Sequence, residues 1–194
     1  MEQLPLFGRS QVRELEAARY GSAPAEHEQS AESLQAWKQR IINFQSALRS
    51  QPPALATDLF GQVPAAVAIA HSIDPWQLRR RSLEFWRWPA ASAGTAALYF
   101  VIDYHCSLLL YVGETIKANQ RWKGEHDCKD YVARYQSLHH QHGLACEVGI
   151  GFWLNAPTQT RPRQQLETIL IDYWRSPFNK QNWQQWSTPF TMAT

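Results

Sequence analysis

The stretch that decides the fold is LYFVIDYHCSLLLYVG, at residues 98–113. Its two ends, LYFVI and LLLYV, are rich in aromatic, β-branched and aliphatic residues, and the five residues between them suit a hairpin connection. If the turn is centred on His105, residue numbers across the hairpin sum to 210, so Tyr99 directly faces Tyr111. Directly opposed Cβ atoms lie about 4.5–5.5 Å apart, which allows two phenols to share one small ligand.

Beyond this hairpin, a third strand is expected at residues 146–154, where apolar residues alternate with two glycines and a tryptophan. Helices are expected before and after that strand, at about 116–123, 128–140 and 162–174. The sequence from residue 93 to 194 therefore predicts an α+β domain, with a small three-stranded antiparallel sheet flanked by helices.

The chain before this domain is expected to have two parts. Residues 1–29 are polar and interrupted by glycine and proline, which predicts a partly flexible tail. Residues 30–92 are expected to form a mostly helical region. Apolar residues keep helical spacing over 34–48, and a short apolar helix is expected at 64–71.

A third helix is expected at 76–88, with Asp74 as its cap and Pro75 at its first position. It carries four arginines, namely Arg79, Arg80, Arg81 and Arg87. Such a charge run is usually the solvated face of a packing helix. Arginines close together can instead bind DNA phosphates through bidentate hydrogen bonds and displace counterions. A packing helix and a clamp on the DNA backbone both stay open at this point.

Length and composition exclude several classes of protein. The chain of 194 residues can bury a sizeable core, and its net charge of +2 is too small to indicate nucleic acid by itself. No run of about 18 apolar residues is present, which excludes an ordinary membrane-spanning helix. The amino terminus has no basic segment leading into an apolar one, and the three cysteines form no disulfide framework. The cytoplasm is the expected location.

Two tripeptides and three single residues form a set with regular spacing. The set is LYF at 98–100, YVG at 111–113, Arg121, Glu167 and Asn179. Arg121 follows Tyr111 by ten residues, and Asn179 follows Glu167 by twelve. Over about residues 96–183 the set resembles the GIY-YIG nuclease superfamily, and its spacings resemble those of the DNA-repair excision nucleases. The first tripeptide keeps only the tyrosine and the β character of the family pattern, so the resemblance rests on the whole set.

Glu167 is the sharpest single candidate, as a metal ligand. It shares a helical face with Leu170, Ile171 and Trp174, where an unpaired carboxylate would be costly to bury. A divalent cation would compensate its charge. With one carboxylate and no obvious second, such a site suits Mg²⁺ or Mn²⁺, because these ions keep much of their water shell.

Arg121 is expected to bind the scissile phosphate. Lys117 lies one helical turn before it, and two cations on one face repel each other unless an anion lies between them. Gly113 follows the second tyrosine, where a missing side chain lets a backbone or ligand approach closely.

The resemblance implies roles for four further residues. A hairpin tyrosine, either Tyr99 or Tyr111, orients or deprotonates the attacking water. A free phenol titrates near pH ~10, so this work requires a nearby cation or metal ion. His126 is placed to assist proton transfer, and Asn179 organises the site without performing the chemistry.

The sequence therefore predicts a metal-dependent DNA endonuclease that hydrolyses phosphodiester bonds. Two other classes remain: a catalytically silent DNA-binding protein on the same fold, and a protein-interaction module that uses the nine tryptophans. The form of the substrate stays open between a specific site, branched DNA, any duplex and RNA. Cutting both strands with one site would favour a homodimer or sequential nicking.

Overall fold

The part of the chain that the computed structural model describes is residues 30–55, 57, 59–83, 95–116 and 127–187. From Ala31 onward the chain forms one compact unit. No helix in these ranges combines the length and the apolar character needed to cross a membrane. The tail expected at 1–29 and nearly all of the helix expected at 116–123 lie outside the described residues.

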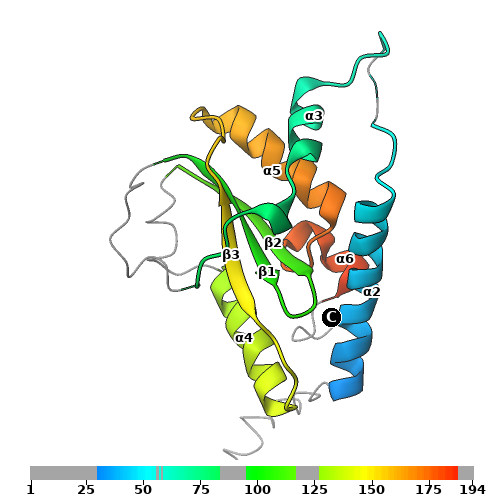
Figure 1. The fold of residues 1–194 in the computed structure, drawn as a ribbon, viewed down its shortest axis with the longest axis vertical. Coiled ribbons are helices and arrows are strands. Elements are labelled where there is room, and N and C mark those ends of the chain that lie inside the picture. Colours follow the sequence, from blue (N-terminus) through cyan, green and yellow to red (C-terminus); the bar gives the residue numbers. More distant parts are fainter. Residues whose placement is uncertain (1–29, 56, 58, 84–94, 117–126, 188–194) are drawn as a thin grey trace, which may run out of the picture. The chain divides into compact units, whose positions relative to one another are not determined.

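The centre of the fold is a three-stranded antiparallel sheet in the order β2-β1-β3 (Figure 1). Its strands are β1 (Ala97–Asp103), β2 (Leu108–Thr115) and β3 (Val148–Trp153), which confirms the three runs expected from the sequence. Every residue of the central strand β1 is buried. The protein therefore has the expected α+β fold, with a small antiparallel sheet flanked by helices and preceded by a helical region.

Helices cover both faces of this sheet. Alternate β1 residues, among them Tyr99 and Val101, pack with residues of α2 (Ala31–Ser50) and α4 (Asp127–Gln141). The other face of β1 packs with α3 (Ala65–Ser72) and α5 (Thr160–Trp174). These four helices confirm the helices expected at 34–48, 64–71, 128–140 and 162–174. The described chain ends with two short helices, η3 (Lys180–Asn182) and α6 (Trp183–Trp186).

The expected register of the hairpin is wrong by two residues. Tyr99 pairs with Gly113, and Tyr111 pairs with Val101. One residue of the difference comes from the turn, which is centred between His105 and Cys106 because Asp103 pairs with Leu108. The other comes from a β-bulge, in which Leu110 has no partner on β1.

The bulge also changes which side chains share a face. Leu110 and Tyr111 are neighbours in sequence, yet both pack on the core that contains Tyr99. In a regular strand successive side chains point to opposite faces, so only the extra residue brings this about. As a result Tyr111 lies diagonally across from Tyr99, rather than directly opposite it.

The third helix expected in the amino-terminal region is wrong over its described residues. Asp74 does cap the segment by accepting a hydrogen bond from the Trp76 amide, at 2.9 Å. Only one turn of 3-10 helix follows, η1 (Pro75–Gln77), and Leu78 is already extended. The Arg81 backbone then pairs with Ile150 on the outer edge of β3. Sheet pairing overrides the local helix signal here, and residues 84–88 lie outside the description.

Two glycines of β3 make room for this extended segment. A Cβ atom on Gly151 would lie 2.9 Å from the Leu78 Cβ, and one on Gly149 would lie 3.1 Å from the Arg81 carbonyl oxygen. Any larger residue at Gly151 would therefore require Leu78 to shift. The alternation of β3 with glycine therefore serves this backbone approach.

Candidate active site

Tyr99 and Tyr111 form a stacked pair on one face of the sheet. Their ring centroids are 5.9 Å apart and the planes differ by 28°. Tyr99 is fully buried, between Tyr111 and Phe152, whose ring lies 6.1 Å away. Tyr111 is partly exposed. The structure thus brings the two tyrosines together as the sequence suggested, but leaves only the second one open to solvent.

Gly113 is what allows the two rings to lie side by side. A Cβ atom at this position would overlap the Tyr99 phenol and would lie 2.7 Å from Cε1 of Tyr111. Gly113 is the direct partner of Tyr99 across the ladder, so the ring of Tyr99 lies over its bare Cα. The glycine is therefore required by close packing of the tyrosine pair, and not by an unusual backbone angle.

Asn179 lies at the free edge of β2, beside the tyrosine pair. Its Oδ1 accepts from the Val112 amide at 3.0 Å, and its Nδ2 donates to the Val112 carbonyl at 2.8 Å. The Ser176 hydroxyl donates to the same Oδ1 at 2.6 Å. The asparagine is buried, and it closes the strand edge in the way a further strand would. Its geometry is that of a positioning residue.

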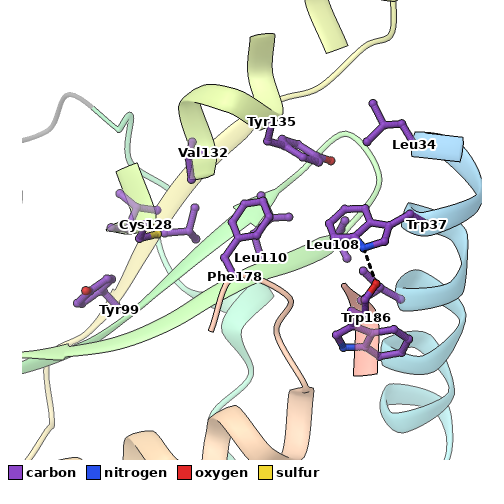
Figure 2. Close-up of a cluster of buried hydrophobic side chains, with 13 residues drawn as sticks. Leu34, Trp37, Tyr99, Leu108, Leu110, Cys128, Val132, Tyr135, Phe178 and Trp186 are labelled. Atoms are coloured by element: carbon purple, nitrogen blue, oxygen red, sulfur yellow. Dashed lines mark hydrogen bonds between the residues drawn. The ribbon is translucent and has the colours of Figure 1, made fainter. Parts of the chain in front are cut away.

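The same edge is closed by two further groups. The Gln45 side chain of α2 binds both the amide and the carbonyl of Leu109, at 2.9 and 3.0 Å. Between these two amide side chains, the backbone amide of Phe178 donates to the Leu110 carbonyl at 2.9 Å. Two distant segments, α2 and residues 178–179, therefore hold β2 in its bulged form. Figure 2 shows Phe178 beside Leu110 in the core.

Glu167 lies half-buried on α5, which runs alongside β2. Near the start of α5, Arg163 Nε donates to Glu114 at 2.5 Å, and at its end the Trp174 carbonyl accepts from Gln45. Leu166 and Leu170 of α5 pack in the core on the sheet face opposite to the one that carries Tyr99 and Tyr111, so Glu167 stands on a helix of that other face.

Arg163 is a site-supporting residue that the sequence reasoning missed. Its side chain is buried, and besides Glu114 it donates to the carbonyls of Pro157, Thr158 and Gln159. It thereby joins the loop before α5 to the end of β2. The sequence did contain a signal for this ion pair. Arg163 lies one turn before Glu167 on an apolar helix face, and a buried arginine there requires a carboxylate partner.

Four predicted residues lie outside the described part of the chain, namely Lys117, Arg121, His126 and Arg87. Two described residues, one on each side of the first three, are buried in the fold. Thr115 is buried at the end of β2, and Cys128 at the start of α4 is buried in the same cluster as Tyr99. Figure 2 shows Cys128 beside Tyr99 at one end of that cluster.

The other three predicted DNA contacts do not form one helical face. Arg80 donates to Glu147 at 2.7 Å, with its guanidinium 4.7 Å from the centre of the Tyr104 ring. Arg81 pairs through its backbone with Ile150. Arg79 is exposed. The three arginines follow an extended segment along β3.

A second polar cluster lies at the turn end of the hairpin, around the buried carboxylate of Asp103. Lys38 Nζ lies 3.3 Å from it and 2.8 Å from His139 Nε2, and the Tyr135 hydroxyl donates to it at 2.7 Å. Burial raises the pKa of Asp103, but hydrogen bonds from the Glu147 amide and Tyr135 and the Lys38 charge outweigh it, so the net pKa is lowered. Burial also raises the pKa of the neighbouring Cys106 thiol, to about 12. Asp103, Tyr135 and His139 are fully buried, and the raised pKa of Cys106 means that its thiol is not activated.

No three histidine, cysteine or carboxylate side chains in the described ranges converge to hold a metal ion. A divalent ion at Glu167 would therefore have at most one further histidine, cysteine or carboxylate ligand among the described residues, and water would complete its coordination. That donor set fits Mg²⁺ or Mn²⁺, which are commonly held by one or two carboxylates.

Comparisons of the chain with protein-family models, with curated proteins and with solved structures give no significant match.

Proposed function

We propose that the protein is a metal-dependent endonuclease that hydrolyses phosphodiester bonds in DNA. The observation that carries the proposal is the stacked pair of Tyr99 and Tyr111 over Gly113, on the strand β2 that Asn179 binds and that α5, the helix of Glu167, contacts from the other face of the sheet. These are the residues of the sequence set that lie within the described chain.

The structure favours Tyr111 over Tyr99 as the residue that acts on water. A residue that orients or deprotonates a nucleophile has to reach it, and Tyr111 is the exposed member of the pair. Tyr99 packs against the Tyr111 ring as its buried stacking partner. In this proposal the Arg121 guanidinium binds the scissile phosphate, and its charge favours the phenolate form of Tyr111. His126 assists proton transfer.

Glu167 is the metal ligand of the proposal. When bound, the ion would stabilise the negative charge that develops on the phosphoryl and leaving oxygens. Asn179 does no chemistry, since both groups of its amide bind the backbone of Val112. Its task is to hold the strand on which Tyr111 and Gly113 lie.

Arg79 and Arg87 remain proposed contacts to the DNA backbone, and Lys117 adds positive charge near Arg121. Arg80 contributes less, because its guanidinium is bonded to Glu147. The proposed contacts are non-specific, since phosphate binding carries no base information.

The test is a cleavage assay of purified protein on plasmid, linear duplex and branched DNA, with and without Mg²⁺ or Mn²⁺. Cleavage should require the ion, and Glu167→Gln should lower the rate by at least about 100-fold, while the melting temperature and DNA affinity stay near wild type. Asp172→Asn is the matched control, because it removes an exposed carboxylate from the same helix. Binding without cleavage by the wild-type protein would indicate a silent DNA-binding protein instead.

A further inference from the structure

A strip of half-buried aromatic side chains continues from Tyr111 along the free edge of β2. Tyr131 on α4 lies 5.9 Å from Phe178 and 5.6 Å from Trp183, measured between ring centroids. Phe178 is itself bonded to the Leu110 carbonyl, next to Tyr111. The strip of Tyr111, Tyr131 and Trp183 is thus linked through Phe178, at the edge of β2 that also carries the proposed active site.

The members of this strip differ from the aromatic core beneath them. Tyr135, Phe178 and Trp37 belong to the same cluster, and their exposed fractions are 0%, 1% and 5%. Tyr111, Tyr131 and Trp183 all stay partly exposed. Aromatic rings with one buried and one open surface are well suited to stack on flat ligands.

The strip also carries positive charge. The Lys180 ammonium lies 5.9 Å from the centre of the Trp183 ring, and Arg134 is exposed one turn after Tyr131 on α4. Of the two cations in the segment 175–187, Lys180 lies on the strip, whereas the Arg175 guanidinium lies 4.9 Å from the centre of the Phe44 ring on α2. Aromatic rings interleaved with cations match a ligand that has both flat bases and phosphates.

We infer that this strip stacks bases of an unpaired DNA strand, so that the substrate of the proposed nuclease has a single-stranded segment next to the scissile bond. This inference rests on the proposed function. Duplex bases are stacked on one another and offer no free ring faces, whereas unpaired bases do. The strip selects strand form and not sequence, because every base has a π-face.

The experiment compares three labelled probes by fluorescence anisotropy in EDTA, which prevents cleavage. They are a blunt duplex, the same duplex with a single-stranded overhang, and that overhang with abasic nucleotides that keep the phosphates and lack the bases. The wild-type protein should bind the base-bearing overhang about 5- to 100-fold more tightly than the abasic one. Equal affinity for these two probes would overturn the inference without any variant being needed.

Trp183→Leu and Tyr131→Leu should each reduce the ratio between the base-bearing and abasic probes, while affinity for the abasic probe stays the same. Trp153→Leu is the control, since Trp153 is half-buried on the opposite face of the sheet. Melting temperatures verify that each variant is folded. If both strip variants keep the wild-type ratio, the inference is wrong.

The same probes with Mg²⁺ separate this inference from the proposed function. Base-dependent binding through Trp183 without any cleavage would support the stacking inference and contradict the nuclease proposal. Cleavage of all three probes at one rate would support the nuclease proposal and contradict the stacking inference. Cleavage concentrated beside the base-bearing overhang is the result expected if both hold.

Discussion

The two ends of the β1–β2 hairpin carry polar clusters of opposite character. At the turn end, the Asp103 carboxylate accepts from five donors, on Lys38, Tyr135, Cys106 and the backbones of His105 and Glu147. At the other end, the Tyr99–Tyr111 pair lies over a glycine, and its outer ring is open to solvent.

This difference shows that a dense group of titratable residues is not by itself an active site. Around Asp103 the charges and hydrogen bonds satisfy one another out of reach of solvent, which stabilises the meeting of α2, α4 and the hairpin. Beside Tyr111, a glycine and a bulge allow two rings to lie together at a partly exposed surface. Accessibility and close approach, more than the number of polar groups, are the reasons why the active site is proposed at the second cluster.

The largest effect is expected from Asp103→Ala. This change leaves the Lys38 ammonium buried without its carboxylate, and breaking such a pair costs about 3–5 kcal/mol of unfolding free energy. Urea unfolding measures the loss, and the cleavage rate per folded molecule should not change. Tyr135→Phe, which removes one hydrogen bond to the same carboxylate, should cost less, about 1.5–3 kcal/mol. Equal losses for the two variants would contradict the central role of Asp103.

A smaller effect, on activity rather than stability, is expected from Gly113→Ala. The added methyl group overlaps both phenols and displaces them, and a shift of about 1 Å can lower a rate by roughly 100-fold. The measurement is kcat at saturating DNA. Gly151→Ala is the matched control, because its Cβ would lie 2.9 Å from the Leu78 Cβ, on the other edge strand. Both should lose about 1–3 kcal/mol of stability through overpacking, and only Gly113→Ala should lose turnover.

The smallest effect is expected from pH. His139 Nδ1 donates to the Tyr135 carbonyl at 2.7 Å, and its Nε2 faces the Lys38 ammonium, so the folded protein holds a neutral imidazole. Burial lowers the pKa of His139 below the usual value near 6.5, and Lys38 and His105 act in the same direction, against the hydrogen bond to the Tyr135 carbonyl and the charge of Asp103. Its contribution to stability is thus complete above about pH 6.5 and is lost as the pH falls through the folded pKa.

Chemical unfolding between pH 7.5 and about pH 5 checks this sign. The unfolding free energy of the wild-type protein should fall with decreasing pH, by at most about 1.4 kcal/mol per pH unit for one proton. His139→Gln should flatten that slope. Burial lowers the pKa of His71 as well, so His71→Gln serves as the comparison. It should remove only the part of the pH dependence that comes from His71. An unchanged slope in His139→Gln would show that the imidazole is not neutral in the fold.

The sequence by itself determined the elements and most of the candidate residues. Alternating and helical periodicities placed β1, β2, β3, α2, α3, α4 and α5 correctly, since these patterns are local and reflect which side of each element is buried. The two tyrosines do lie together because both stand on one hairpin, but the expected direct pairing of Tyr99 with Tyr111 is wrong, since they are diagonal neighbours. The roles of Glu167 and Arg121 in chemistry remain predictions.

Only the tertiary structure decided how these elements fit together. The bulge at Leu110 is held by Gln45 and Asn179, which lie 64 and 67 residues away from the backbone groups they bind. The helix expected after Pro75 gave way to an extended segment because the edge of β3 offered backbone partners to Arg81. Arg163 donates to the carboxylate of Glu114, which lies 49 residues earlier in the chain. Local propensity is worth a fraction of a kcal/mol per residue, so long-range hydrogen bonds and packing override it wherever the two disagree.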